Sequence, residues 1–406
     1  MSKSDKKFFP MFEVLLFPTL KCNLNCDYCY VYEWRKQREL RRRGKEMSLE
    51  TAKKAIDLLY ANRGGNKKLS IWLFGGEPTV HSRFKEFVEG VLKYAEGQYG
   101  DVNWSIGMTT NGVRMSNEKF AKFVAERFGT LTISLDGVRE HHDKHRKFPS
   151  GEGSWKYVVK AIKNLATLMR KGEAKTNFVQ IHITYSPDTV RYFKDDVVFV
   201  DKLTDGINSD IATEFVYEAD WKDEHYRMLE KQLELTLEYA LDVLYNEDRV
   251  LRWNLLMRVA QILFGMPPPN NQRCGLGQGV VAVAPDGYIY QCQRAVQKLP
   301  PIGHVDEGFY ERRYQLWETF DRIKIKDRLN CWRCPFHLIC AAGCILVNWE
   351  VNKDFYTPPR SLCKISKIVA KVLPSYYMCA KASAKEEIVV EYLRKNRLRT
   401  GKPLCP

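Results

Sequence analysis

The chain has 406 residues, a net charge of +15 at pH 7, and a hydrophobic content of 45%. This length predicts one large domain with a smaller one beside it. No stretch reaches the roughly 18 uninterrupted apolar residues that a membrane-spanning helix needs, which excludes a helical membrane protein, and the basic charge favours an anionic partner or substrate.

Segments typical of strands alternate with segments typical of helices through the first half of the chain. They follow the order strand 12–17, helix 48–59, strand 69–74, helix 84–94, strand 104–108, helix 119–128, strand 131–135, helix 155–169, strand 178–185 and strand 211–217. Ser48 has the type of side chain that caps a helix N-terminus. This α/β pattern predicts a parallel sheet curled into a partial (β/α)6 TIM-like barrel, with the chemistry at the carboxyl ends of its strands.

The second half has a different character. Helix patterns continue over 224–245 and 255–264, and the run Pro267-Pro268-Pro269 then interrupts them. We expect a first domain over residues 1–255, a small irregular cysteine-rich domain over 256–380, and a basic helical tail over 381–406.

A basic run extends from Arg35 to Lys45. We favour the solvated face of a helix for this run, with contact to an acidic peptide as the alternative. No RNA-binding motif accompanies it, so we do not expect a nucleic-acid partner.

The twelve cysteines are clustered rather than spread along the chain, and none lies between Cys29 and Cys274. This distribution favours metal-bound thiolates in a reducing compartment over a disulfide framework. No cleavage site follows the apolar stretch near the N-terminus, so we expect a cytoplasmic protein.

Cys22, Cys26 and Cys29 form a C-x3-C-x2-C motif shortly after the first predicted strand. Three thiolates on one loop can hold three irons of a 4Fe–4S cluster and leave the fourth iron without a protein ligand. The alternative is zinc, for which three cysteines supply one ligand too few for a closed structural site.

Together with Gly75-Gly76-Glu77-Pro78 after the second strand, this motif resembles the radical S-adenosylmethionine (radical SAM) enzymes. In that family the open iron binds the amine and carboxylate of S-adenosylmethionine, and one electron then cleaves its sulfur–carbon bond to give a 5′-deoxyadenosyl radical. The resemblance implies that the Gly-Gly-Glu-Pro segment holds the cofactor amine through backbone carbonyls.

Further cofactor contacts follow from the same resemblance. Tyr28, just before the third cysteine, is expected beside the adenine. Asn111 and Ser134, after the third and fourth strands, are expected at the ribose and methionine ends of the cofactor, and Arg146 at the methionine carboxylate. Ordinary turn chemistry is the alternative for each of these residues.

Three histidines, His141, His142 and His145, follow the fourth strand. They fit either a second metal site or the polar side of a short helix.

The cysteines of the second half resemble those of the SPASM domain, an appendage of radical SAM enzymes that modify peptides and proteins. The resemblance implies two auxiliary 4Fe–4S clusters. One, the distal cluster, would be fully held by Cys331, Cys334, Cys340 and Cys363. The other, the near cluster, would be held by Cys274, Cys292 and Cys344. Taken alone, the run from Cys331 to Cys344 also fits a zinc knuckle.

The chain departs from relatives of this kind at two positions. Where some carry a further cysteine ligand of the near cluster, this chain has Val280, which leaves one iron open unless Cys379 or Cys405 closes the site. Where sulfatase-maturating enzymes carry an aspartate after the second SPASM cysteine, this chain has Gln293, which cannot accept a proton at neutral pH.

The sequence therefore predicts a radical SAM/SPASM enzyme that oxidises or crosslinks a peptide or protein, with thioether formation as the leading specific hypothesis. Formylglycine formation in a sulfatase, a small-molecule radical reaction and a zinc-stabilised binding protein are the alternatives. An electron donor such as flavodoxin or ferredoxin is expected. Only 21 residues precede Cys22, so any leader recognition is expected to use a separate protein or another surface such as the basic run.

Overall fold

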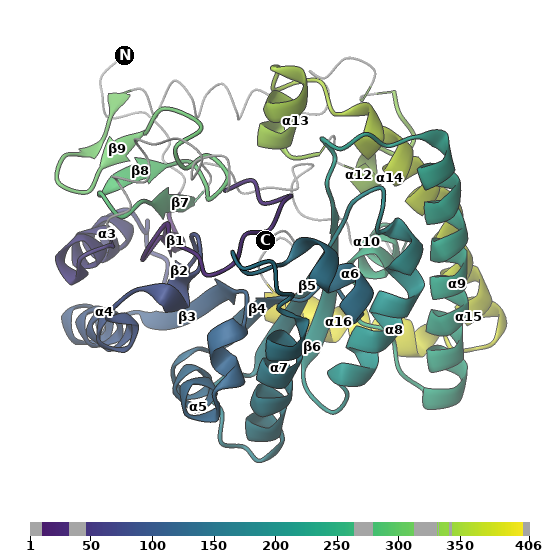
Figure 1. The fold of residues 1–406 in the computed structure, drawn as a ribbon, viewed down its shortest axis with the longest axis horizontal. Coiled ribbons are helices and arrows are strands. Elements are labelled where there is room, and N and C mark those ends of the chain that lie inside the picture. The colour runs from purple at the N-terminus through teal and green to yellow at the C-terminus, as the bar shows by residue number, and fades with distance from the viewer. Residues whose placement is uncertain are drawn as a thin grey trace.

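The computed structural model of the chain describes residues 10–31, 46–263, 279–311, 331, 333–340 and 343–400. At its centre is one ten-stranded sheet in the order β10-β9-β8-β7-β1-β2-β3-β4-β5-β6. Strands β1 to β6 pair in parallel with their chain neighbours, and helices cover their outer side (Figure 1). The predicted partial barrel is confirmed.

The strands of the barrel are β1 (Glu13–Leu16), β2 (Lys68–Leu73), β3 (Asn103–Thr110), β4 (Thr130–Ser134), β5 (Phe178–Tyr185) and β6 (Ser209–Phe215). The helices of this part are α3 (Leu49–Ala61), α4 (Phe84–Gln98), α5 (Glu118–Arg127), α6 (Arg139–His145), α7 (Trp155–Arg170), α8 (Phe193–Leu203), α9 (Asp223–Glu247) and α10 (Asn254–Leu263). Each predicted strand and helix of the first half is present, with ends shifted by a few residues.

Local chemistry explains where individual elements begin. Ser48 caps α3 as expected, because its hydroxyl accepts a hydrogen bond of 3.0 Å from the backbone N–H of Thr51. Along β5 buried and half-buried residues alternate, since successive side chains of a strand point to opposite faces.

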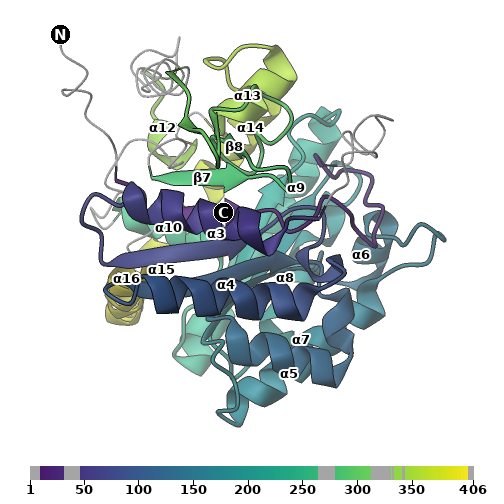
Figure 2. The ribbon, with the colours of Figure 1, turned by 90° about the vertical axis from the view of Figure 1, so that its left-hand side faces the viewer.

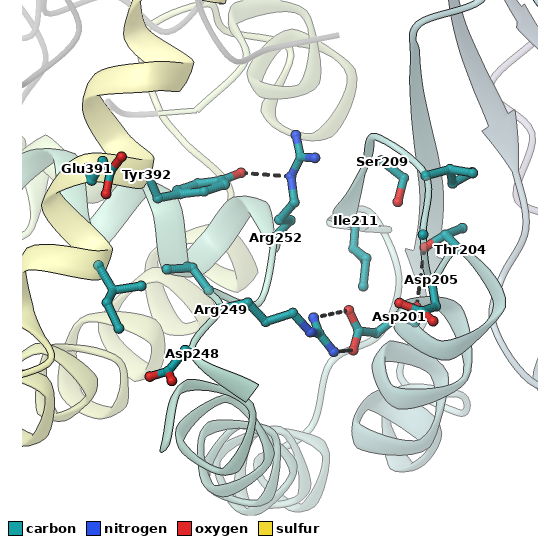
Figure 3. Close-up of a pocket in the computed structure, with 14 residues that line it drawn as sticks. Asp201, Thr204, Asp205, Ser209, Ile211, Asp248, Arg249, Arg252, Glu391 and Tyr392 are labelled. Carbon is teal, nitrogen blue, oxygen red and sulfur yellow. Dashed lines mark hydrogen bonds and ion pairs between the residues drawn. The ribbon is translucent and has the colours of Figure 1, made fainter. Parts of the chain in front are cut away.

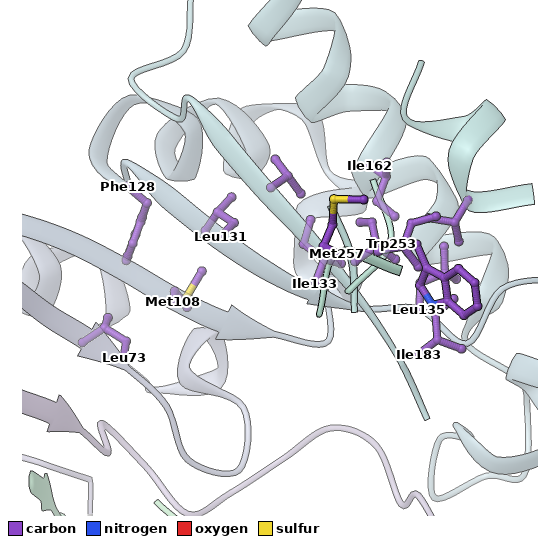
Figure 4. Close-up of a cluster of buried hydrophobic side chains, with 14 of the residues drawn as sticks. Leu73, Met108, Phe128, Leu131, Ile133, Leu135, Ile162, Ile183, Trp253 and Met257 are labelled. Carbon is purple, nitrogen blue, oxygen red and sulfur yellow. The ribbon is translucent and has the colours of Figure 1, made fainter. Parts of the chain in front are cut away.

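The core between the sheet and its helices is continuous and apolar. Figure 4 shows side chains from successive strands, such as Met108, Leu131 and Ile183, which belong to one buried cluster with Ile162 of α7 and Trp253. These side chains are almost fully buried. This packing fixes the strands rigidly, so that the loops at their carboxyl ends are held in place.

The region after residue 278 is more regular than its sequence predicts. It contains β7 (Val280–Val283), β8 (Tyr288–Tyr290), β9 (Gly303–His304), β10 (Gly308–Phe309), α12 (His337–Cys340), α13 (Ile345–Asn352), α14 (Arg360–Val372), α15 (Pro374–Ala382) and α16 (Glu386–Thr400). Strand β7 pairs in parallel with β1, with Val281 opposite Val14, so this region extends the barrel sheet. Figure 1 shows β7 and β8 beside β1, and Figure 2 shows α13 and α14 on the same side of the molecule as β7 and β8.

The expected domain limits fall on these elements as follows. The limit between residues 255 and 256 lies inside α10, and the expected tail contains α16. The basic run from Arg35 to Lys45 lies outside the described residues.

Candidate active site

The cysteine loop leaves β1 at the carboxyl edge of the sheet. Burial raises the pKa of the Cys26 thiol to about 12, and the neighbouring thiols of Cys29 and Cys22 raise it further, against the opposing charge of Arg146. The three sulfurs are thus close enough to interact. Burial therefore favours the neutral thiol of Cys26, and a bound metal centre supplies the positive charge that converts such thiols into thiolates.

Two glycines hold the stem of this loop. The backbone N–H of Gly76 donates to the carbonyl of Thr19 over 3.1 Å, and the N–H of Glu77 donates to the carbonyl of Lys21 over 2.8 Å. A Cβ atom on Gly76 would lie 2.2 Å from the Lys21 carbonyl oxygen, and Gly75 has a φ of 134° that other residues rarely adopt. The Gly-Gly pair therefore serves first to let two backbones meet just before Cys22.

The buried Glu77 side chain connects the ends of β2 and β3 through hydrogen bonds. Its carboxylate accepts hydrogen bonds from the Thr79 hydroxyl at 2.6 Å, the Thr110 hydroxyl at 2.7 Å and the Asn111 backbone N–H at 2.6 Å. Burial raises the pKa of Glu77, while these hydrogen bonds oppose the rise. Pro78 follows at the start of a short 3₁₀ helix, η2 (Pro78–Val80). The carboxylate thus fixes the backbone around the expected cofactor segment.

Asn111 lies beside the cysteine loop. Its side-chain amide donates to Asn23 Oδ1 over 2.7 Å and lies 3.8 Å from the Cys22 sulfur. Ser134, at the end of β4, is paired in register with His182 of β5. Both predicted residues are therefore at the carboxyl edge of the sheet, where a cofactor of the loop would bind.

Asp136, which sequence analysis did not single out, anchors two of the predicted cofactor residues. Its carboxylate accepts from Arg146 Nε over 2.8 Å, from the Thr184 backbone N–H over 2.9 Å and from the Tyr28 hydroxyl. The Arg146 guanidinium also lies 5.4 Å from the Tyr28 ring centre. In this structure Arg146 and Tyr28 are thus engaged with Asp136, and their expected contacts with the cofactor stay predictions.

We expect Asp136→Asn to lower the free energy of unfolding by about 3–5 kcal/mol at pH 7, because it leaves the buried Arg146 charge without its partner. Burial alone would raise the pKa of Asp136, but the Arg146 charge outweighs it and holds the pKa well below its usual range. The stabilisation is therefore complete above the unfolded pKa of about 3.9 and is lost as pH falls through the folded value.

Urea unfolding of both proteins at pH 7 and at low pH measures this effect, and the difference between them should shrink at low pH. The matched control is Asp195→Asn on α8, where the carboxylate is 63% exposed and pairs with Lys194. A full-sized difference that persists in acid would contradict the ion-pair explanation.

The three histidines of α6 are occupied within the fold. His141 Nδ1 lies 2.7 Å from Asp196 Oδ2, His142 Nε2 bonds with the Ser154 hydroxyl at 2.9 Å, and His145 Nδ1 lies 2.8 Å from Asp27 Oδ1. The last contact ties the cysteine loop to α6. These partners support the polar-helix interpretation over a second metal site.

The four cysteines predicted for the distal cluster come together. Burial raises the pKa of Cys363 to about 11, and the thiols of Cys340, Cys331 and Cys334 raise it further. Cys363 lies on α14, which packs against α12, where Cys340 is the last residue. Cysteines that are distant in sequence thus bring their thiols to one place in the fold.

Two of the three cysteines predicted for the near cluster also meet. Burial raises the pKa of Cys292 to about 12, and the thiol of Cys344, which precedes α13, raises it further. Cys29, Cys344 and Val280 all pack against one buried cluster that contains Cys292. Cys274 and Cys405 lie outside the described residues, and Cys379 lies on α15.

A charged group between these cysteine sets was not foreseen. Arg294 Nε donates to Glu350 Oε2 over 2.8 Å, Lys298 pairs with the other oxygen of Glu350, and both cations lie over the Tyr30 ring at 4.7 and 5.1 Å. Burial raises the pKa of Tyr30, and the charges of Cys29 and Cys292 add to this rise. Tyr30 is therefore near both sets of thiols.

In the described part of the chain, no three Cys, His, Asp or Glu side chains lie close enough to share a single metal ion. A cubane cluster holds its ligands farther apart, one on each iron, so this spacing does not bear on the cluster predictions. Within the same part, no helix is long and apolar enough to cross a membrane.

A cavity of about 420 Å³ lies elsewhere, between α8, the segment 248–252 that follows α9, and α16 (Figure 3). It adjoins Ser209, the first residue of β6, whereas the cysteine loop lies where the strands end. Its Arg249 pairs with Asp201, and its Arg252 bonds with Tyr392. The cavity is thus at the opposite edge of the sheet from the candidate active site.

Comparison with known proteins agrees with this geometry. Residues 16–195 match the Radical SAM superfamily. A cysteine-type anaerobic sulfatase-maturating enzyme of Clostridium novyi is 26% identical over 336 residues, covering 80% of this chain and 84% of that protein. Mycofactocin maturase MftC of Mycolicibacterium smegmatis is 26% identical over 337 residues, covering 80% and 76%.

Solved structures share the fold. Native anSMEcpe with bound AdoMet superposes with a TM-score of 0.73 at 19% identity, covering 93% of this chain and 100% of that one. Streptococcus suis SuiB bound to precursor peptide SuiA gives a TM-score of 0.57 at 15% identity, covering 87% and 76%.

Proposed function

This chain is an enzyme with a radical SAM domain, and we propose that it oxidises or crosslinks a residue of a peptide or protein. Its cofactors are S-adenosylmethionine and a 4Fe–4S cluster held by Cys22, Cys26 and Cys29. The observation that carries the proposal is the position of these three cysteines on one loop that follows β1, at the carboxyl ends of the parallel strands. When bound, the cluster and S-adenosylmethionine supply a 5′-deoxyadenosyl radical that removes a hydrogen atom from the substrate.

The protein's own residues hold and orient this centre. Gly75 and Gly76 fix the stem of the cysteine loop, and Glu77 fixes the segment next to it. Asp136 orients Tyr28 and Arg146 at the far end of the loop. Buried residues that contact the ligands of a metal centre, without binding the metal themselves, set the geometry of those ligands.

We extend the proposal to two auxiliary 4Fe–4S clusters, within a division of the chain into 1–255, 256–380 and 381–406. The distal cluster is held by Cys331, Cys334, Cys340 and Cys363, and the thiol of Cys363 interacts with each of the other three. The near cluster is held by Cys274, Cys292 and Cys344. Val280 packs against the buried group around Cys292, so its side chain offers no fourth thiolate there.

An iron without a protein thiolate can bind a substrate thiolate, so thioether formation is the specific reaction that we favour. Electrons would come from a donor such as flavodoxin or ferredoxin. The clustered cysteines favour a cytoplasmic protein, with leader recognition, where it occurs, by a separate protein or another surface of the chain.

The experiment uses anaerobically reconstituted full-length protein, S-adenosylmethionine, a strong reductant and cysteine-containing peptides encoded near its gene. We expect a product that has lost two hydrogens and whose cysteine no longer reacts with iodoacetamide. A product that keeps its reactive thiol would exclude the thioether but retain oxidation or another bridge. Release of no 5′-deoxyadenosine in the presence or absence of any peptide would overturn the radical function itself.

Formylglycine formation in a sulfatase is the second candidate, favoured by the similarity to sulfatase-maturating enzymes along most of the chain. The residue after Cys292 counts against it, because Gln293 cannot serve as a base. A sulfatase-derived peptide carrying cysteine or serine at the modified position tests this candidate, and an unchanged peptide would exclude it.

A further inference from the structure

One histidine has no hydrogen-bond partner within the described part of the chain. The sequence contains eight histidines, and all eight are among the described residues. The other seven each bond to a backbone or side-chain group of the protein. His182, the exception, lies on β5 and is half-buried. Polar groups inside a protein normally have partners, so an imidazole left without one indicates a place where a ligand binds.

The imidazole of His182 faces the interior of the barrel. Along β5 buried residues alternate with half-buried ones, and the buried Ile181 and Ile183 belong to the core beneath the outer helices. Successive side chains of a strand point to opposite faces, so His182 points away from that core. The same alternation turns Glu214 of β6 inward, because the next residue, Phe215, lies in the core. Two adjacent strands thus present a histidine and a carboxylate to the interior.

His182 and Glu214 are neighbours on this inner face. In the sheet His182 lies opposite Ala212, and Glu214 follows two residues later on the same face of β6. Burial lowers the pKa of His182 below its usual value of 6.5, and the nearby Glu214 charge opposes this fall. Arg146 lowers the same pKa and Asp136 raises it. The imidazole is therefore neutral at pH 7, with a nitrogen lone pair that can accept a proton.

His182 lies at the border of the proposed cofactor site. Its neighbour on β4 is Ser134, one of the residues expected at the cofactor. The expected cofactor contacts come from the cysteine loop, from the ends of β2, β3 and β4, and from Arg146 directly after α6. This leaves the inner faces of β5 and β6 for the substrate residue, which must lie against the cofactor for its hydrogen to be removed.

The proposed oxidation needs a base. A residue that loses two hydrogens gives one to the deoxyadenosyl radical as an atom and the other to a base as a proton. Gln293 cannot take this proton. A neutral histidine beside the cofactor site has the chemistry for the task.

We propose that His182 accepts the proton that the substrate residue gives up, and that the Glu214 carboxylate stabilises the imidazolium that forms. The inference rests on the proposed function. The bond to the acidic hydrogen of the substrate residue, S–H for a cysteine, breaks, and its electron pair stays on that residue. The proton forms an N–H bond with the imidazole, so this step needs no oxidant.

The test uses anaerobically reconstituted full-length protein and the peptide that yields a product in the experiment above. His182→Asn should form this product about a hundredfold more slowly, because a general base contributes about 10²–10⁴-fold. The variant should bind S-adenosylmethionine with unchanged affinity in calorimetry. It should also accumulate a substrate radical, visible by freeze-quench electron paramagnetic resonance. The matched control is His225→Asn at the start of α9, which should behave as the unsubstituted protein does.

The pH profile distinguishes a base from a residue that only supports the fold. Product formation should rise with pH through the pKa of His182 and then level off, and His182→Asn should lack this rise. Glu214→Gln is the second variant. Because it removes a charge that raises the pKa of His182, it should move the rise to lower pH.

Three results would overturn the inference while leaving the proposed function intact. These are weaker binding of S-adenosylmethionine in His182→Asn, which would make the histidine a cofactor contact, an unchanged rate in that variant, and a pH profile that Glu214→Gln does not move. Failure of the unsubstituted protein to release 5′-deoxyadenosine, or to modify any peptide, would instead overturn the proposed function, and the inference with it.

Discussion

Cys26→Ser should abolish the release of 5′-deoxyadenosine and remove about four irons from each chain. Cys26 is the middle ligand of the proposed radical cluster, and its partly buried thiol interacts with both other thiols of the loop. A serine hydroxyl does not ionise at neutral pH, so one iron would lose its anionic ligand. Anaerobic iron and sulfide analysis, together with chromatography of the cleavage products, measures both effects.

Cys379→Ser is the matched control for this substitution. Cys379 lies on α15, within the second half of the chain, and its replacement should change neither the iron content nor the cleavage rate. Cleavage that survives in Cys26→Ser would contradict the assignment of the loop as the radical centre. Loss of iron in Cys379→Ser would identify this residue as the missing ligand of the near cluster.

Gly76→Ala should have the second largest effect, although it adds only a methyl group. The new Cβ would lie 2.2 Å from the carbonyl oxygen of Lys21 and 2.5 Å from that of Leu20, and neither backbone atom can move without shifting the cysteine loop. Overpacking of this kind costs about 1–3 kcal/mol. We expect a lower melting temperature and weaker binding of S-adenosylmethionine in anaerobic calorimetry.

Gly97→Ala provides the comparison for Gly76→Ala. Gly97 lies in α4, and its added Cβ would have no neighbour within 4 Å. Alanine is the better helix former by roughly 1 kcal/mol, so this variant should be slightly more stable and should bind the cofactor normally. Equal binding in the two variants would show that the stem of the loop tolerates displacement.

The barrel was predictable because its residues signal their structure locally. Strand β5 spans the predicted residues, 178–185, and α3 begins after the expected cap at Ser48. The second half was less predictable because cysteines and short loops interrupt its patterns. Helix α14 nevertheless buries Leu362, Ile365, Val369 and Val372 at helical spacing, a signal that was present in the sequence.

The candidate site likewise has parts that the sequence predicts and parts that only the folded structure shows. The C-x3-C-x2-C motif and the Gly-Gly-Glu-Pro segment are contiguous, so the sequence alone indicated them. The partners that hold the site are joined only by folding: Asp136 meets Tyr28 across 108 residues, and Arg294 meets Glu350 across 56. No local sequence pattern predicts such contacts, because the sequence does not distinguish the carboxylates of Asp136 and Glu350 from those of surface residues.

The parallel pairing of β7 with β1 has a consequence for anyone who divides this protein. Because β1 lies between β2 and β7, a fragment that ends before residue 279 would expose the N–H and C=O groups along one side of β1. Exposed edge strands with unpaired backbone groups pair with strands of other chains and promote aggregation. A shortened or chimeric version should therefore retain β7 or replace it with an equivalent strand, and a cut at the apparent junction of the two halves would produce an insoluble polypeptide.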